Sequence, residues 1–194
     1  MEILQAILII ALSFWMVLDQ QGFVVVTWFP SIVGLIAGII MGDIGTAMVI
    51  AGTLQLMAWG VANIGGSSVP NYGLATVIGV YVAIRTTHDL EHAKAVALAV
   101  GVPVGMLGIQ LDVIAKILCT SVTHAAQKAM NAGKYAKMNR ILWIGPLIFG
   151  LSTALPTALF IIFGDKIVKL ILEVLPVWFI NGLTIAGGLL PIVG

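Results

Sequence analysis

The feature that most constrains this chain is an interval without any charged residue, residues 44–84, that nevertheless contains polar side chains. Its centre, residues 52–70, is rich in amides, glycines and serines: Gln55, Trp59, Asn63, Gly65, Gly66, Ser67 and Ser68. A lipid-facing helix of this composition would leave amide and hydroxyl groups without partners, each at a cost of several kcal/mol. The chain must therefore bury this stretch within protein or around a polar cavity.

Two interpretations fit this stretch. In the first, it is a polar packing seam in which small residues allow close approach and amides join neighbouring helices. In the second, it is a broken or re-entrant segment that lines a polar cavity, and uncharged amides and hydroxyls would suit a neutral polyhydroxylated solute. Spacing alone does not distinguish them.

The surrounding composition places the chain in a membrane. Of its 194 residues, 60% are hydrophobic and only 9% are charged, with a mean hydropathy of +1.13. Soluble domains usually have about 25% charged residues, so the sequence predicts an integral membrane protein. The basic residues form no run interleaved with aromatic residues, which excludes a nucleic-acid partner.

The apolar runs predict an all-α, multi-span helical bundle that forms one transmembrane domain over residues 1–194. We expect Pro30 to kink the second run, and we expect further spans beyond Gly194. Residues 72–84 and 95–120 each fit either a full span or one limb of a re-entrant hairpin. The expected helical runs are residues 3–18, 23–41, 72–84, 95–120 and 141–163.

Local patterns add packing and capping predictions. Gly34, Gly38 and Gly42 recur every four residues, which is typical of a stripe against which another helix packs closely. Asp43 follows this stripe and is well placed to cap the next helix. Asp112 and Lys116 are four residues apart, a spacing at which they can pair, either within a span or at its interfacial end.

A pair of histidines, His88 and His92, has the spacing at which two imidazoles can share a metal ion. The segment also contains Asp89 and Glu91, so a solvated loop with offsetting charges explains it equally well. With no further ligands nearby, we predict no metal site and no cofactor.

Residues 123–140 are the hydrophilic part of the chain. They carry four basic side chains and no acidic one, which places them in the cytoplasm by the positive-inside rule. The first half is expected to form an amphipathic helix that ends near Gly133. This segment can orient the protein and contact phospholipid, or it can dock an acidic soluble partner. The basic residues are Lys128, Lys134, Lys137 and Arg140.

Gln55, Trp59 and Asn63 lie on one face of a predicted helix, because they are spaced by four residues. Gly65, Gly66 and Pro70 then predict a break. An amide followed by a glycine pair recurs at Asn181. This weak echo is the pattern expected of an internal, inverted repeat around a central site.

With these residues in view, the chain resembles enzyme IIC, a membrane component of the mannose/fructose/sorbose family of the bacterial sugar phosphotransferase system. The resemblance extends over nearly the whole chain, and family members usually continue for several more apolar segments. The motifs that carry it are Gly52-Thr-Leu-Gln-Leu-Met-Ala-Trp-Gly, Asn63-Ile-Gly, the segment from Gly34 to Asp43, His124-Ala-Ala-Gln-Lys-Ala and Asn181-Gly-Leu-Thr-Ile-Ala-Gly-Gly.

The resemblance implies a multi-pass protein of the bacterial inner (cytoplasmic) membrane that translocates a hexose or related sugar. It implies a second membrane component, enzyme IID, as partner, phosphorylated cytoplasmic A and B components, and assembly into a homo- or hetero-oligomer within membrane lipid. It also implies that the phosphorylated residues lie on A and B, so we expect no catalytic residue on this chain.

Applied to this sequence, the resemblance favours a sugar site. Gln55 and Asn63 are expected to hydrogen-bond sugar hydroxyls, and Trp59 is expected to stack against the sugar ring. Ser67, Ser68 and Asn181 are further candidates, and the four basic residues of 123–140 are expected to dock component B. The alternatives are an ion-coupled transporter that relies on Asp112, and a membrane scaffold in which the amides only join helices.

Overall fold

The computed structural model describes residues 2–61, 69–86 and 89–174, together with Trp178 and Gly182. Every regular element in this part of the chain is helical, which confirms the predicted all-α class. The elements are α1 (Glu2–Leu18), a π-helical turn (Asp19–Phe23), α2 (Pro30–Met41), α3 (Ile44–Trp59), α4 (Tyr72–Thr86), α5 (Leu90–Asn131), α6 (Tyr135–Leu142) and α7 (Ile144–Val174).

Three helical stretches in the described residues are long and apolar enough to cross a membrane: Ile3–Gly22, His92–Asn131 and Tyr135–Gly164. The helices α2, α3 and α4 are apolar but shorter. By length and composition, these helices fit the predicted integral membrane protein.

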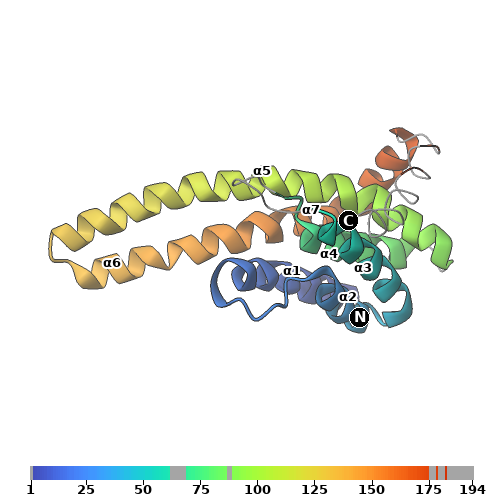
Figure 1. Ribbon diagram of the computed structural model, residues 1–194, viewed down its shortest axis with the longest axis horizontal. Coiled ribbons are helices and arrows are strands. Elements are labelled where there is room, and N and C mark those ends of the chain that lie inside the picture. The colour runs from blue at the N-terminus through green and yellow to red at the C-terminus, as the bar shows by residue number, and fades with distance from the viewer. Residues whose placement is uncertain (1, 62–68, 87–88, 175–177, 179–181, 183–194) are drawn as a thin grey trace.

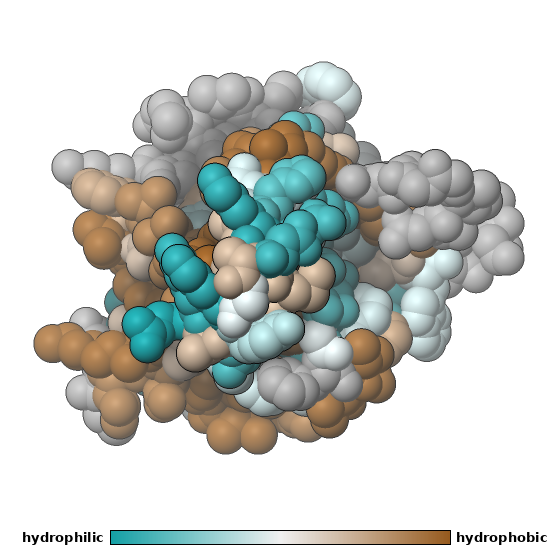
Figure 2. Space-filling model, turned by 90° about the vertical axis from the view of Figure 1, so that its left-hand side faces the viewer, coloured by the Kyte–Doolittle hydropathy of each residue, from teal (hydrophilic) through white to brown (hydrophobic). Residues whose placement is uncertain are grey.

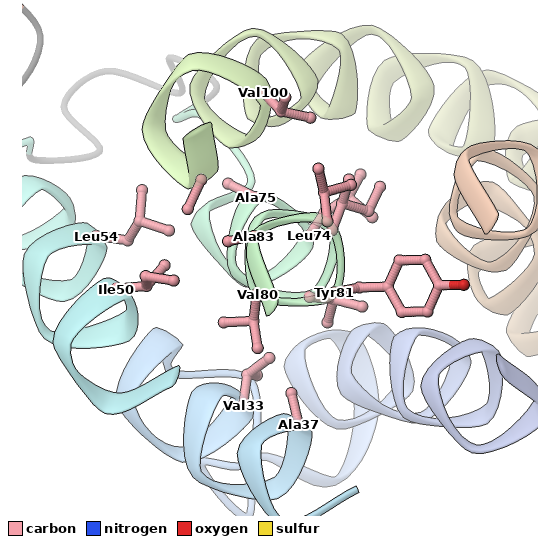
Figure 3. Close-up of a cluster of buried hydrophobic side chains, with 14 of the residues drawn as sticks. Val33, Ala37, Ile50, Leu54, Leu74, Ala75, Val80, Tyr81, Ala83 and Val100 are labelled. Carbon is pink, nitrogen blue, oxygen red and sulfur yellow. The ribbon is translucent and has the colours of Figure 1, made fainter. Parts of the chain in front are cut away.

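The short helix α4 lies at the centre of the fold. Its 15 residues span about 22 Å, which is less than the roughly 30 Å of a bilayer's hydrocarbon core. Every residue from Gly73 to Ala83 is buried, because α1, α2, α3, α5 and α7 all pack against it. Figure 3 shows α4 surrounded by side chains of α2 (Val33, Ala37), α3 (Ile50, Leu54) and α5 (Val100). An enclosed helix of this length can end inside the protein without exposing its ends to lipid.

The glycine stripe of α2 packs against α3, as predicted. A Cβ atom on Gly34 would lie 2.1 Å from the Cβ of Ala51, and one on Gly38 would lie 2.8 Å from the Cβ of Ala47. Gly42 ends α2 with a φ of +83°, and an Asp43 carboxylate oxygen accepts a hydrogen bond from the Thr46 N–H at 3.0 Å. The sequence-based packing and capping predictions are both confirmed here.

The prediction of a continuous second helix kinked at Pro30 is wrong. Residues 24–29 are not helical, and Pro30 is the first residue of α2. Proline suits this position because the first N–H of a helix has no intrahelical acceptor.

The helix that carries Gln55 also ends earlier than predicted. The sequence predicted a break after Asn63, but α3 ends at Trp59 and Gly60 is its C-cap. Gly60 accounts for the earlier end, because glycine is a poor helix former. It comes five residues before Gly65, the first of the residues that were predicted to break the helix. The chain between 62 and 68 and the echo at Asn181 lie outside the described residues.

A polar seam joins α1 to α7. The hydroxyls of Ser13 and Thr157 are hydrogen-bonded at 2.8 Å, and the Thr153 hydroxyl donates to the carbonyl of Ser13 at 2.8 Å. All three side chains are buried. The seam is the kind of small-residue hydrogen bonding that holds transmembrane helices together.

The helices α5, α6 and α7 form a long antiparallel arm that projects from the helical body (Figure 1). At 42 residues, α5 is about 63 Å long, roughly twice the hydrocarbon thickness. The predicted amphipathic helix before Gly133 is the end of α5, and Gly133 has the positive φ of +69° expected there. Figure 2, which looks onto the end of the arm, shows hydrophilic residues gathered at its tip.

Candidate functional site

A cavity of about 440 Å³ lies where the ends of four helices meet beside the middle of α5. Its volume is in the lower part of the range of about 300–1,000 Å³ that is typical of small-molecule sites. The lining is mixed in character, with aromatic rings and several amides. The principal lining residues are Gln20, Gln21, Trp28, Phe29, Pro30, Gln55, Trp59, Asn71, Tyr72, Gly108, Asp112 and Lys116.

Gln55 is a buried member of this lining, with 6% of its surface exposed. Its Oε1 accepts hydrogen bonds from the N–H and the hydroxyl of Ser31, both at 3.3 Å. Its Nε2 has no hydrogen-bond partner among the described residues. A buried donor without a partner costs about 1–3 kcal/mol, which makes this amide nitrogen a candidate to donate to a ligand at the cavity wall.

Trp28 supplies a second donor of this kind. Its ring is stacked on Phe29 with the centroids 4.4 Å apart, and its buried Nε1 lacks a hydrogen-bond partner in the described part of the chain. Sequence reasoning missed Trp28, because residues 23–41 were predicted to be one continuous helix. The available signal was Pro30, because proline is common at the first position of a helix, and Trp28 and Phe29 come directly before it.

Trp59 lines the same cavity as Gln55, as predicted from their spacing of four residues. It is the last residue of α3 and is 72% exposed. An exposed indole at a cavity wall can stack against the C–H face of a ring-shaped solute. The other predicted members of the site, Asn63, Ser67 and Asn181, lie outside the described residues, as does Ser68.

The beginning of α4 forms another part of the wall. The side-chain oxygen of Asn71 accepts from the Leu74 N–H at 2.9 Å and so caps α4, while the Asn71 N–H donates to the Gly105 carbonyl of α5 at 3.0 Å. The helix starts at Tyr72, which lines the cavity. Since α2 also starts beside the cavity, the positive ends of two helix dipoles face it.

The predicted pairing of Asp112 with Lys116 is confirmed. The Lys116 ammonium lies 2.6 Å from the Asp112 carboxylate, and both residues line the cavity from α5. Asp112 is the carboxylate on which an ion-coupled transporter would rely, and it is therefore already paired with Lys116.

The four basic residues predicted to dock a partner are all exposed. Lys128 lies in the last turn of α5, Lys134 lies in the turn of the arm, and Lys137 and Arg140 lie on α6. They therefore all lie around the turn between α5 and α6, at the tip of the arm, where Figure 2 shows hydrophilic surface.

His92 lies near the opposite end of α5 and contacts a carboxylate. Its Nδ1 is hydrogen-bonded to Asp89, and this bond lowers the pKa of the Asp89 carboxyl. His88 lies outside the described residues. Within those residues, no group of three or more histidine, cysteine, aspartate or glutamate side chains is placed to hold a metal ion.

Comparison with known sequences and structures shows what the chain is similar to. The family model described as "PTS system sorbose-specific iic component" matches residues 3–194. Among curated proteins, the chain is 30% identical to the sorbose-specific EIIC component of Lacticaseibacillus casei, over 85% of this chain and 58% of that protein. It is 29% identical to the mannose-specific EIIC component of Escherichia coli K12, over 85% of this chain and 61% of that protein.

The chain thus spans about three fifths of the length of these two relatives. It also matches a chain in the cryo-EM structure of the mannose transporter ManYZ with microcin E492, with a TM-score of 0.74 and 26% identity. That match covers 98% of this chain and 76% of the other.

Proposed function

Because the chain belongs to the family of the sorbose-specific IIC components of the phosphotransferase system (PTS), we propose that it is a sugar-translocating membrane component of such a system. It is an integral protein of the inner membrane. In this proposal the cavity holds a hexose or related sugar on its way across the membrane. Separate cytoplasmic components phosphorylate the sugar, and this chain contributes binding and passage.

The observation that carries the proposal is the amide donor of Gln55 in the cavity wall, which has no partner among the described residues. Ser31 occupies the acceptor side of the amide, so a ligand of Gln55 must offer an acceptor, as every sugar hydroxyl does. The indole N–H of Trp28 needs a second acceptor. Two donors and a stacking ring, Trp59, suit a polyhydroxylated ring compound.

The charges in the cavity also favour a neutral sugar. Asp112 and Lys116 offset one another in an ion pair, so the lining carries no net charge from this pair. Their remaining hydrogen-bonding capacity suits hydroxyl groups, which both donate and accept. Relatives are named for sorbose and mannose, and these two sugars are the first to test.

We further propose that the chain works with enzyme IID in the membrane and with phosphorylated A and B components. The exposed basic tip of the arm, formed by Lys128, Lys134, Lys137 and Arg140, is the proposed docking surface for component B. Positive charge steers an acidic or phosphorylated partner toward the membrane, and the same charges contact anionic lipid headgroups.

Uptake into membrane vesicles tests the proposal. Vesicles that contain the chain and enzyme IID are given labelled mannose or sorbose, with and without phosphoenolpyruvate and the soluble components. Sugar phosphate inside the vesicles supports the proposal. Dependence on an ion gradient supports the ion-coupled alternative, and absence of uptake supports the scaffold alternative.

Gln55→Leu is the variant that tests the site itself. It approximately keeps the size of the side chain and removes the amide, so we expect uptake to be lost while membrane insertion is retained. Gln110→Leu is the matched control, because Gln110 is exposed on α5 and is not among the described lining residues. Normal uptake by Gln55→Leu would contradict the proposed site.

A further inference from the structure

Asp19 is a fully buried carboxylate at the end of α1, in the π-helical turn. It accepts hydrogen bonds from the N–H groups of Val25 and Thr27, and from the Thr27 hydroxyl at 2.6 Å. The Thr27 oxygen in turn accepts from the indole N–H of Trp15 at 3.1 Å. A buried acid in a membrane protein is costly, and these hydrogen bonds all hold one short segment.

That segment, residues 24–27, has an unfavourable backbone. Val24 has a φ of +55° and Val26 a φ of +83°, in the left-handed region that β-branched residues rarely adopt. Packing does not explain the conformation, because the side chains of Val24 and Val26 are 62% and 39% exposed. The three bonds to the Asp19 carboxylate oppose this strain, together with a main-chain bond from the Val24 N–H to the Asp19 carbonyl at 2.8 Å.

The segment joins two parts of the cavity wall. Gln20 and Gln21 line the cavity directly after Asp19, and Trp28, Phe29 and Pro30 line it directly after Thr27. Asp19 is not itself among the described lining residues. Its hydrogen bonds to Val25 and Thr27 connect these two parts of the wall, just before α2 begins at Pro30.

The start of α2 matters because Ser31 lies there. Ser31 holds the oxygen of Gln55, and Trp28 carries the cavity's second donor without a partner in the described part of the chain. Trp28 and Ser31 both lie within four positions of Thr27. Movement of the 24–27 segment would therefore displace the Trp28 indole directly and the Gln55 amide through Ser31.

We propose that Asp19 is a positioning residue for the sugar site: its carboxylate holds the strained 24–27 segment so that Trp28 and the Ser31–Gln55 pair face the ligand together. This inference rests on the function proposed above and assigns a role within it to a residue that does not touch the sugar. A residue that only capped α1 would affect the amount of inserted protein, but not the affinity for sugar.

The test compares four variants of the full chain, co-expressed with enzyme IID in membrane vesicles. Asp19→Asn keeps one side-chain oxygen as an acceptor and loses the other. Thr27→Val removes the hydroxyl, whereas Thr27→Ser keeps it. Thr53→Val is the control for the loss of a threonine hydroxyl, because the Thr53 hydroxyl bonds to the carbonyl of Val49 within α3. Each variant is assayed for the KM and maximal rate of mannose and sorbose uptake, normalised to inserted protein, and for hydrogen exchange at residues 24–29.

For Asp19→Asn we expect the KM to rise by about tenfold and the amides of Val25 and Thr27 to exchange faster, because charged hydrogen bonds are lost. Thr27→Val is expected to shift both quantities in the same direction by a smaller factor. Thr27→Ser and Thr53→Val are expected to behave like the parent chain.

Faster exchange with an unchanged KM in Asp19→Asn would overturn the positioning role. If the Asp19→Asn protein does not insert into the membrane, an unchanged KM for Thr27→Val would overturn the positioning role in the same way. Absence of uptake by the parent chain would instead contradict the proposed function, so the two failures are distinguishable.

Discussion

Ser31 donates two hydrogen bonds to the side-chain oxygen of Gln55, one from its N–H and one from its hydroxyl, across 24 residues of sequence. This contact joins the first turn of α2 to the last turns of α3. Both donors bond to the oxygen, and the amide nitrogen of Gln55 has no hydrogen-bond partner among the described residues. The orientation of the site's principal donor therefore depends on Ser31.

Removing the Ser31 hydroxyl should weaken sugar binding without abolishing it. In Ser31→Ala the backbone N–H still bonds to Gln55, and one hydrogen bond is typically worth about 0.5–1.5 kcal/mol, or roughly two- to tenfold in affinity. We expect the KM for uptake to rise by a factor in this range. Ser152→Ala is the control, because that hydroxyl bonds to the Phe149 carbonyl within α7; equal KM values for both variants would refute the orienting role of Ser31.

Trp28→Phe should separate the donor of Trp28 from its ring. Phenylalanine retains an aromatic face next to Phe29 but has no N–H, so a sugar hydroxyl loses one donor. A loss of about 1 kcal/mol would raise the KM roughly fivefold. Trp143→Phe serves as the control, since Trp143 is 67% exposed and lies on the arm. The same KM in both variants would show that the indole N–H does not bind the substrate.

Gly34→Ala should destabilise the bundle. The added Cβ would lie 2.1 Å from the Cβ of Ala51, so α2 and α3 would have to separate, at a cost of about 1–3 kcal/mol. Gly52→Ala on α3 is the control, because a Cβ there meets nothing within 4 Å among the described residues. Thermal unfolding in detergent measures the difference.

The double variant Gly34→Ala/Ala51→Gly refines this test. If the clash is between these two Cβ atoms, exchanging them should recover much of the lost stability, because the two mutations are directly coupled. A double variant that is less stable than Gly34→Ala would show that α2 and α3 do not pack through this pair.

Reversing the charge of the arm's tip should weaken docking of component B. Replacing Lys134, Lys137 and Arg140 by Glu reverses three of the tip's four positive charges, which would steer the partner. We expect slower association with the soluble component in a binding measurement, and a weaker dependence on salt. Lys94→Glu, near the other end of α5, is the control.

Vesicle composition separates the two proposed contacts of the tip. The measurement is repeated in vesicles without anionic lipid, so that headgroup binding by the same charges cannot produce the effect. Unchanged association of component B under both conditions would remove this docking role.

The sequence correctly predicted those features that depend on interactions between residues close together in the chain. The cap at Asp43, the pair of Asp112 with Lys116 and the end of the arm near Gly133 each depend on residues within one helical turn. The joint placement of Gln55 and Trp59 follows from helical spacing alone.

The rest depended on features that hydropathy does not reveal. Residues 23–29 are as apolar as a helix, so the non-helical segment held by Asp19, and with it Trp28, was missed. The strain at Val24 and Val26 runs against their intrinsic preference, and the carboxylate that accepts hydrogen bonds from this segment lies several residues away. The central place of α4 was also hidden, since a short apolar run does not show whether protein or lipid surrounds it.

A structure of the protein with mannose or sorbose bound would test the central claim most directly. The account predicts a sugar in the cavity, with one hydroxyl about 3 Å from Nε2 of Gln55, another near Nε1 of Trp28, and the ring against Trp59. A sugar bound elsewhere, with Gln55 Nε2 occupied by another part of the protein, would contradict it.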